Sequence, residues 1–158
     1  MDKIDIRKES EMLQKTTVPS LKETLNREWY FLDLKEKSIG RAATKVADIL
    51  RGKNKTNFSP NADTGAYVIL INSDHLTFTG NKLEKKTYYN HSGYPGGLRE
   101  RSAKVMLEDY SKELVVRTVK GMMPHNKLSN KQLKRLFVYS GTNHSHQSQD
   151  KKIIKIEL

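Results

Sequence analysis

A continuous apolar run, Tyr67-Val68-Ile69-Leu70-Ile71, is the feature that most constrains how this chain can fold. The run does not alternate with polar residues, so the strand that it predicts must be covered on both faces. Such strands are typical of the centre of a parallel sheet packed between helices. The run is far shorter than the roughly 20 apolar residues that a membrane-spanning helix needs, so we expect no membrane partner.

The residues around this run predict a β–α–β unit. Residues 29–34 are aromatic and aliphatic and predict a first strand. Apolar residues then recur at helical spacing from Ile39 to Leu50, and Gly52 stands where a left-handed helix cap would fall. Strand, helix and strand in this order predict an α/β fold with a parallel sheet. Further predicted elements are a short strand at 76–79, helices at 102–109, 111–120 and 130–134, and a last strand at 136–139.

The charge of the chain indicates a polyanionic partner. The sequence has 29 Lys and Arg against 18 Asp and Glu, a formal net charge of +11. Six basic and six acidic residues cancel within residues 1–28, and Leu114 to Gln149 contains no acidic residue. Nucleic acid is the expected partner, because phosphates that are neutralised by Lys and Arg release their condensed counterions.

The residue types argue against most catalytic sites. The chain has no cysteine, which excludes disulfides, thiolate zinc sites and thiol nucleophiles. It also lacks the phosphate-binding loop of nucleotide hydrolases and the glycine fingerprint of dinucleotide-binding folds. We therefore expect no metal, no cofactor and no enzymatic activity. A nuclease that uses carboxylates such as Asp33 and Asp63 is the enzymatic alternative.

The stretch from Gly80 to Gly97 is rich in lysine, tyrosine and glycine. Lysines can reach phosphates, tyrosines can stack on splayed bases, and glycines let the backbone approach a polyphosphate closely. The alternative is a surface hairpin in which Tyr88 or Tyr89 packs on the core. A second group of cations follows the predicted helix at residues 51–55, where it would suit phosphate contacts or the helix dipole.

A set of motifs occurs in one order along the chain. They are Gly40-Arg41-Ala42-Ala43-Thr44, Leu50-Arg51-Gly52-Lys53-Asn54-Lys55, Asp63-Thr64-Gly65, Thr79-Gly80-Asn81-Lys82, Tyr88-Tyr89-Asn90-His91-Ser92-Gly93-Tyr94-Pro95-Gly96-Gly97, Val119-Lys120-Gly121-Met122-Met123-Pro124 and Leu136-Phe137-Val138-Tyr139-Ser140-Gly141. With them, the chain closely resembles the bacterial-type large-subunit ribosomal protein family called L-thirteen, from about Trp29 to Gln149.

The resemblance implies a three-layer α/β/α fold with a four-stranded, mainly parallel sheet, plus an N-terminal extension. The expected organisation is a neutral extension at 1–28, an rRNA-binding domain at 29–141 and a polar C-terminal tail at 142–158. The implied function is that of a structural constituent of the large ribosomal subunit, which binds 23S-type rRNA and supports early subunit assembly and translation. Neighbouring ribosomal proteins are the implied further partners. The implied location is the cytoplasmic ribosome, with an organellar ribosome left open.

The predicted RNA-binding residues come from two sources. The resemblance implies Arg41, Lys53, Lys55, Lys82, Tyr88, His91, Tyr94, Lys120 and His144. The charge pattern and the glycine–tyrosine stretch add Arg51, Lys85, Lys86, Gly96, Gly97, Lys127, Lys134, Arg135 and His146. The same basic surface would also serve an mRNA-binding translational regulator outside the ribosome, which is the alternative function.

Overall fold

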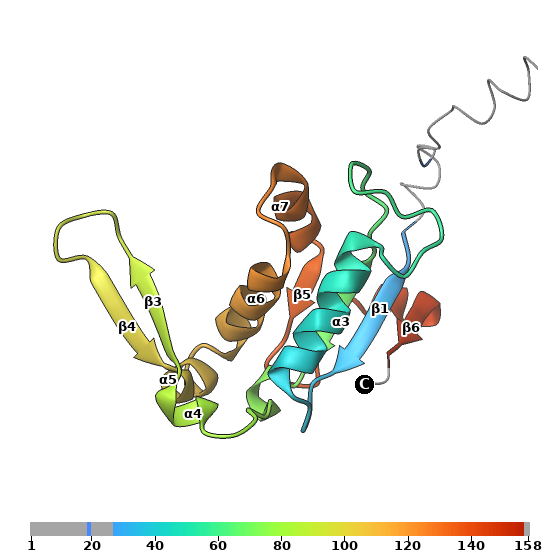
Figure 1. Ribbon diagram of the computed structural model, residues 1–158. Helices are drawn as coiled ribbons and strands as arrows, with labels where there is room; N and C mark the ends of the chain where they lie inside the picture. The colour runs from blue at the N-terminus through green and yellow to red at the C-terminus, as the bar shows by residue number, and fades with distance from the viewer. Residues whose placement is uncertain (1–18, 20–26, 157–158) are drawn as a thin grey trace, which may run out of the picture.

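The computed structural model describes Pro19 and residues 27–156, so most of the predicted N-terminal extension lies outside the described residues. Its main sheet has four strands in the order β5-β2-β1-β6, and all three strand pairs are parallel (Figure 1). The strands are β1 (Trp29–Asp33), β2 (Tyr67–Ile71), β5 (Leu136–Val138) and β6 (Ile153–Lys155). The apolar run thus forms a central strand, as its composition predicts.

Two helices cover one face of this sheet. Helix α3 (Ile39–Arg51) buries a stripe of apolar side chains at helical spacing, and Gly52 ends it with φ of 81°. Helix α6 (Ser111–Met122) lies beside α3 and contributes Leu114 and Val119 to the same core. The inward-facing β2 residues Val68 and Leu70 lie in this core.

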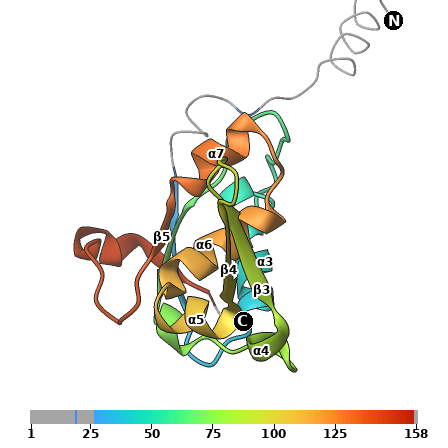
Figure 2. The same ribbon diagram turned by 90° about the vertical axis from the view of Figure 1, so that its left-hand side faces the viewer.

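The opposite face of the sheet is lined by aromatic rings. Trp29 stacks on Tyr67 with ring centroids 4.4 Å apart, and Phe137 lies 6.0 Å from Trp29. The C-terminal segment with the 3-10 helix η2 (Gln147–Lys152) lies on this side, away from α3 and α6 (Figure 2). The three-layer α/β/α fold with a parallel four-stranded sheet is therefore confirmed.

Several elements differ from the sequence-based expectation. Strand β6 lies within the predicted polar tail, where the sequence pattern predicts no strand, yet it pairs with β1. The strand predicted at 76–79 is wrong, because only an isolated bridge joins Ser38 and Thr77 there. The 3-10 helix η1 (Ser73–His75) turns the chain out of the sheet after β2, and Leu76 then enters the core.

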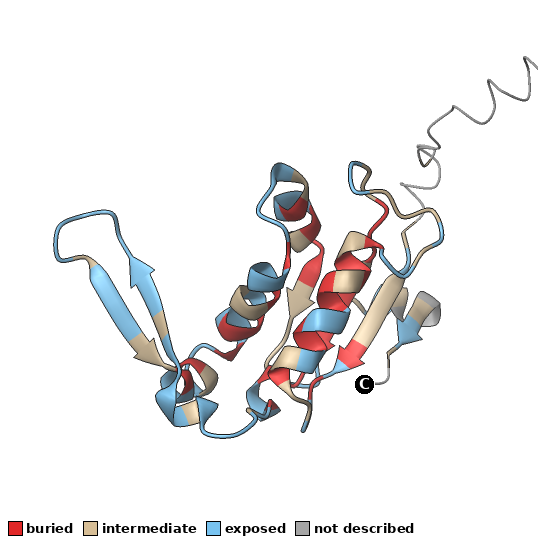
Figure 3. Cartoon of the chain, viewed as in Figure 1, coloured by how far each residue is buried: buried red, intermediate tan, exposed pale blue. Residues whose placement is uncertain are grey.

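A hairpin projects from the body of the domain (Figure 1). It is framed by α4 (Lys82–Lys85) and α5 (Ala103–Glu108), and its antiparallel strands are β3 (Thr87–His91) and β4 (Leu98–Ser102). Most of its residues are exposed (Figure 3). The Arg117 side chain of α6 donates to the Tyr89 carbonyl at 3.4 Å, which ties the hairpin to the body.

The described start of the chain contacts the domain directly. The Tyr67 N–H donates to the Glu28 carbonyl at 3.0 Å, and Arg27 contacts Asp63 at 3.2 Å. Both residues fall within the predicted extension at 1–28, and they fix the chain at the edge of the fold where β1 begins. In the part of the chain that the structure describes, no helix is long and apolar enough to cross a membrane.

Candidate nucleic-acid interface

The tip of the hairpin presents Tyr94 in a fixed turn. The Gly97 N–H donates to the Tyr94 carbonyl at 2.9 Å, and Gly96 has φ of 72°. Pro at the second position and a positive φ at the third match a type II turn. The turn leaves 76% of the Tyr94 surface exposed. An exposed ring on an ordered turn is suited to stacking on an unpaired base.

The two tyrosines in β3 lie on opposite faces of the hairpin, because side chains alternate along a strand. Tyr88 pairs with Arg101, packs partly on the core and carries the Lys86 ammonium 5.1 Å from its ring centre. Tyr89 is 57% exposed and was not among the predicted site residues. Tyr89 therefore presents the exposed ring of the pair. Because side chains alternate along a strand, a Tyr88 that packs on the core predicts an exposed Tyr89.

Lysines gather at the base of the hairpin. Lys82, Lys85 and Lys86 are exposed in and just after α4, and the Lys82 ammonium donates to the Thr79 hydroxyl at 3.1 Å. His91 is exposed near the tip, where its Nδ1 accepts from the Gly93 N–H at 2.9 Å. The projecting hairpin and the helix α4 at its base thus carry all the predicted site residues between 82 and 97.

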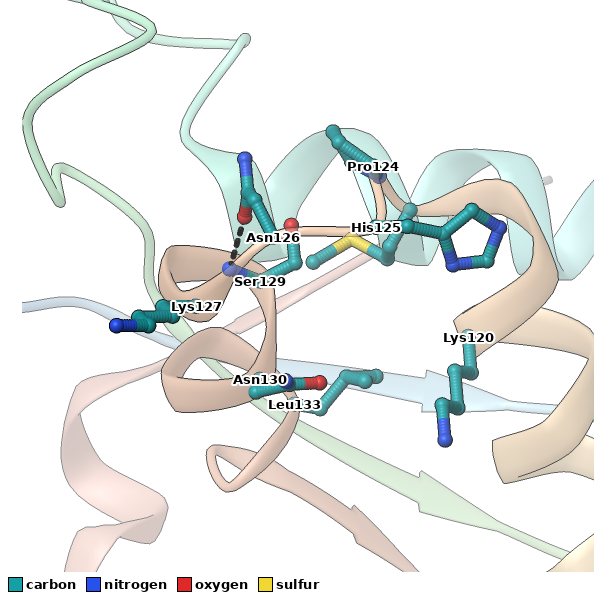
Figure 4. A pocket seen from close by; sticks show the side chains of 9 residues that line it. Lys120, Pro124, His125, Asn126, Lys127, Ser129, Asn130 and Leu133 are labelled. Carbon is teal, nitrogen blue, oxygen red and sulfur yellow. Dashed lines mark hydrogen bonds between the residues drawn. The ribbon is translucent and has the colours of Figure 1, made fainter.

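A second group of predicted residues surrounds a hollow between α6 and α7 (Lys127–Leu133). The hollow has a volume of about 450 Å³, and Lys120, His125 and Lys127 are among its lining residues. Lys127 lies on the opposite side of it from Lys120 and His125 (Figure 4). Asn126 shapes the wall by accepting the Ser129 N–H at 2.7 Å. Two predicted lysines therefore border one concave, cationic surface.

The cations after α3 are partly engaged within the protein. Lys53 pairs with Asp48 at 3.2 Å, and Lys55 lies 3.8 Å from Glu28. Arg51 is half-buried, whereas Arg41 and Lys134 are exposed. Exposed pairs such as Lys53–Asp48 contribute little to stability, so Lys53 stays available for phosphate, whereas the Lys55 side chain is largely covered.

Arg135 differs from the other predicted residues because it is buried. Its guanidinium donates to both carboxylate oxygens of Asp63 at 2.6 and 2.7 Å. It also donates to the carbonyls of Ala66 and Leu50, each at 3.4 Å. The position of Arg135 therefore favours a role within the fold over a contact with RNA.

The two predicted histidines of the C-terminal segment pack on the aromatic face of the sheet. The His146 ring lies 4.3 Å from Phe137 and 5.4 Å from Trp29, and the His144 ring lies 5.7 Å from Phe31. The C-terminal segment that carries them lies on the side of the sheet opposite α3 and α6 (Figure 2). Their rings thus pack the C-terminal segment against the aromatic face of the sheet.

The carboxylates considered for a nuclease are engaged in structural contacts. Asp33 accepts from the Asn72 amide at 2.8 Å and from the Lys35 N–H at 2.9 Å. Burial raises the pKa of Asp63, but hydrogen bonds and charge from Arg135 and Arg27 outweigh burial and hold the pKa below its ordinary value. Among the described residues, no group of three or more His, Cys, Asp or Glu could hold a metal ion.

Known proteins resemble this chain along most of its length. Residues 27–145 match the family model described as ribosomal protein L13. The chain is 50% identical to the large ribosomal subunit protein uL13 of Ureaplasma urealyticum serovar 10, over 84% of this chain and 89% of the relative. It is 47% identical to the protein of the same name from Pelobacter propionicus, over 90% of this chain and 99% of the relative.

Proposed function

Because the chain belongs to the ribosomal protein L13 family, we propose that it is a structural constituent of the large ribosomal subunit and binds 23S-type rRNA. The observation that carries the RNA contact is the projecting β3–β4 hairpin, with Tyr94 held at its tip and three exposed lysines at its base. An isolated two-stranded hairpin is marginally stable in water. A folded RNA that surrounds the hairpin would stabilise it.

The mechanism is binding by charge and stacking. Lys82, Lys85 and Lys86 neutralise phosphates, while Tyr94 and Tyr89 offer exposed faces for unpaired bases. Phosphate contacts carry little sequence information, so the shape of the folded RNA provides most of the specificity. The engaged states of Asp33 and Asp63 support an action without catalysis.

We assign the protein a role in early assembly of the large subunit, in the cytoplasmic ribosome, with neighbouring ribosomal proteins as further partners. A domain that folds around its own core can bind rRNA before the other parts of the particle are in place.

Gradient fractionation of cell extracts tests the proposal. The tagged chain should sediment with the large subunit, and its depletion should cause precursors of that subunit to accumulate. Crosslinking in cells should recover mainly large-subunit rRNA. Absence of the chain from the large-subunit fractions would contradict the proposal, and crosslinks mainly to mRNA would favour a translational regulator.

A further inference from the structure

The hollow between α6 and α7 has a neighbour beside the C-terminal end of α3. The second hollow has a volume of about 250 Å³ and is lined by Arg51, Phe58 and Pro60 among others. Three residues line both hollows, namely Pro124, Asn126 and Ser129. The two hollows therefore adjoin at these residues, and we call them together the α6–α7 groove, with a wide end at Lys120 and a narrow end at Phe58.

The two ends of the groove differ in chemistry. Lys120 and His125 lie on one side of the wide end, where they suit a phosphate. At the narrow end, the Phe58 ring is half-buried, and the Arg51 guanidinium lies 5.9 Å from its centre. A ring and a guanidinium plane are the groups on which nucleobases stack. Among the described residues that line the groove, none is acidic.

The size of the groove fits a single nucleotide. Its two parts together fall within the range of roughly 300–1,000 Å³ that is typical of small-molecule sites. A paired base stays inside its helix, so regular duplex RNA could place only its phosphates at the entrance. A groove with a cationic end and an aromatic end therefore fits an unpaired nucleotide that leaves its helix.

We propose that the α6–α7 groove binds one extruded nucleotide of the bound RNA, with its phosphate at Lys120 and its base at Phe58 and Arg51. This inference rests on the proposed rRNA binding. It specifies an unpaired, extruded nucleotide as the part of the RNA that the groove binds. Because the groove is built from three helix ends, it fixes the register of the RNA on the domain.

Crosslinking and chemical probing of the purified full chain on transcribed large-subunit rRNA test this assignment. Short-wavelength ultraviolet light should give peptides from residues 51–60 and 120–133 that carry a single-nucleotide adduct. Acylation of the ribose 2′-OH should show one nucleotide whose reactivity rises on binding. Phe58→Leu should remove this signal and weaken binding by about tenfold, because it deletes the ring and keeps an apolar side chain.

Matched variants separate this site from general charge. Lys120→Ala should weaken the adduct at the groove, whereas Lys104→Ala, an equal charge change at an exposed position on α5, should leave adduct and reactivity unchanged. The wild-type chain could bind rRNA without any adduct in these peptides, and Phe58→Leu could leave the footprint unaltered. That result would overturn the groove inference and leave the proposed function intact. Micromolar binding of free adenosine monophosphate with an unaltered footprint would identify a free-nucleotide site and also overturn it. Failure of the wild-type chain to bind rRNA would instead overturn the proposed function.

Discussion

Asp63 accepts two hydrogen bonds from Arg135, at 2.6 and 2.7 Å, and so joins two segments that are 72 residues apart in the sequence. The pair lies at the edge of the fold where the loop after α3 meets the start of β5. Arg27 adds a third contact to the same carboxylate at 3.2 Å. One carboxylate thus holds the start of the domain, its central loop and its last helix-to-strand connection.

Replacing this carboxylate should destabilise the domain in a pH-dependent manner. At neutral pH, Asp63→Asn should lower the free energy of unfolding by about 3 kcal/mol, because it leaves the buried Arg135 charge uncompensated. The folded-state pKa of Asp63 is depressed. Its stabilisation is therefore fully present above the unfolded value of about 3.9 and is lost as the pH falls through the lower folded pKa.

Urea unfolding at several pH values, followed by the fluorescence of the single tryptophan Trp29, measures this difference. The gap between wild type and Asp63→Asn should stay constant from pH 7 to about 4 and shrink below that. The control Asp48→Asn removes an exposed ion pair with Lys53 and should cost less than about 1 kcal/mol. An equal loss of unfolding free energy in both variants would show that the Asp63–Arg135 pair stabilises the fold no more than an exposed ion pair does.

Gly65 should be intolerant of any side chain. A Cβ at this position would lie 1.8 Å from the Leu50 carbonyl oxygen, because the chain passes directly against the end of α3. Gly65→Ala should therefore cost more than about 2 kcal/mol. The matched variant Gly141→Ala, where no atom lies within 4 Å of the new Cβ, should change stability by less than about 1 kcal/mol. Thermal unfolding of both variants measures the contrast.

The central β–α–β unit could be predicted because its patterns are local. The apolar run of β2 and the helical repeat of α3 are each visible within a short window of sequence. Strand β6 could not be predicted in this way, because three residues at Ile153–Lys155 carry too weak a pattern. They become a strand because β1 offers a free edge, which is a property of the assembled sheet.

The predicted site shows the same limit. Lysines in an acid-free region stay on the surface because a charged group is costly to bury, so Lys120 and Lys127 could be found from composition. Arg135 belongs to the same basic stretch, but its partner Asp63 is distant in sequence and only the fold brings them together. The histidines at 144 and 146 likewise meet the aromatic rings only after the sheet has formed.

The lysines at the hairpin base should set much of the salt dependence of RNA binding. If each neutralises one phosphate, Lys82, Lys85 and Lys86 changed together to Ala should reduce the slope of log K against log salt by roughly two to three. All three are exposed, so the fold should be unaffected. Lys155→Ala, on β6 at the other side of the molecule (Figure 1), should leave the slope close to that of the wild type. An unchanged slope in the triple variant would show that these lysines do not contact phosphate.

The ring of Tyr94 should contribute to affinity without contributing to stability. Tyr94→Ala should weaken rRNA binding by about tenfold, since stacking on one base is worth roughly 1–3 kcal/mol. Tyr94→Phe should bind like the wild type, because it keeps the stacking face and loses only the hydroxyl. Since 76% of Tyr94 is exposed, both variants should unfold at the wild-type temperature. Filter-binding titrations at fixed salt compare the three proteins, and equal affinities for Ala and Phe would mean that the tip lies outside the stacked part of the interface.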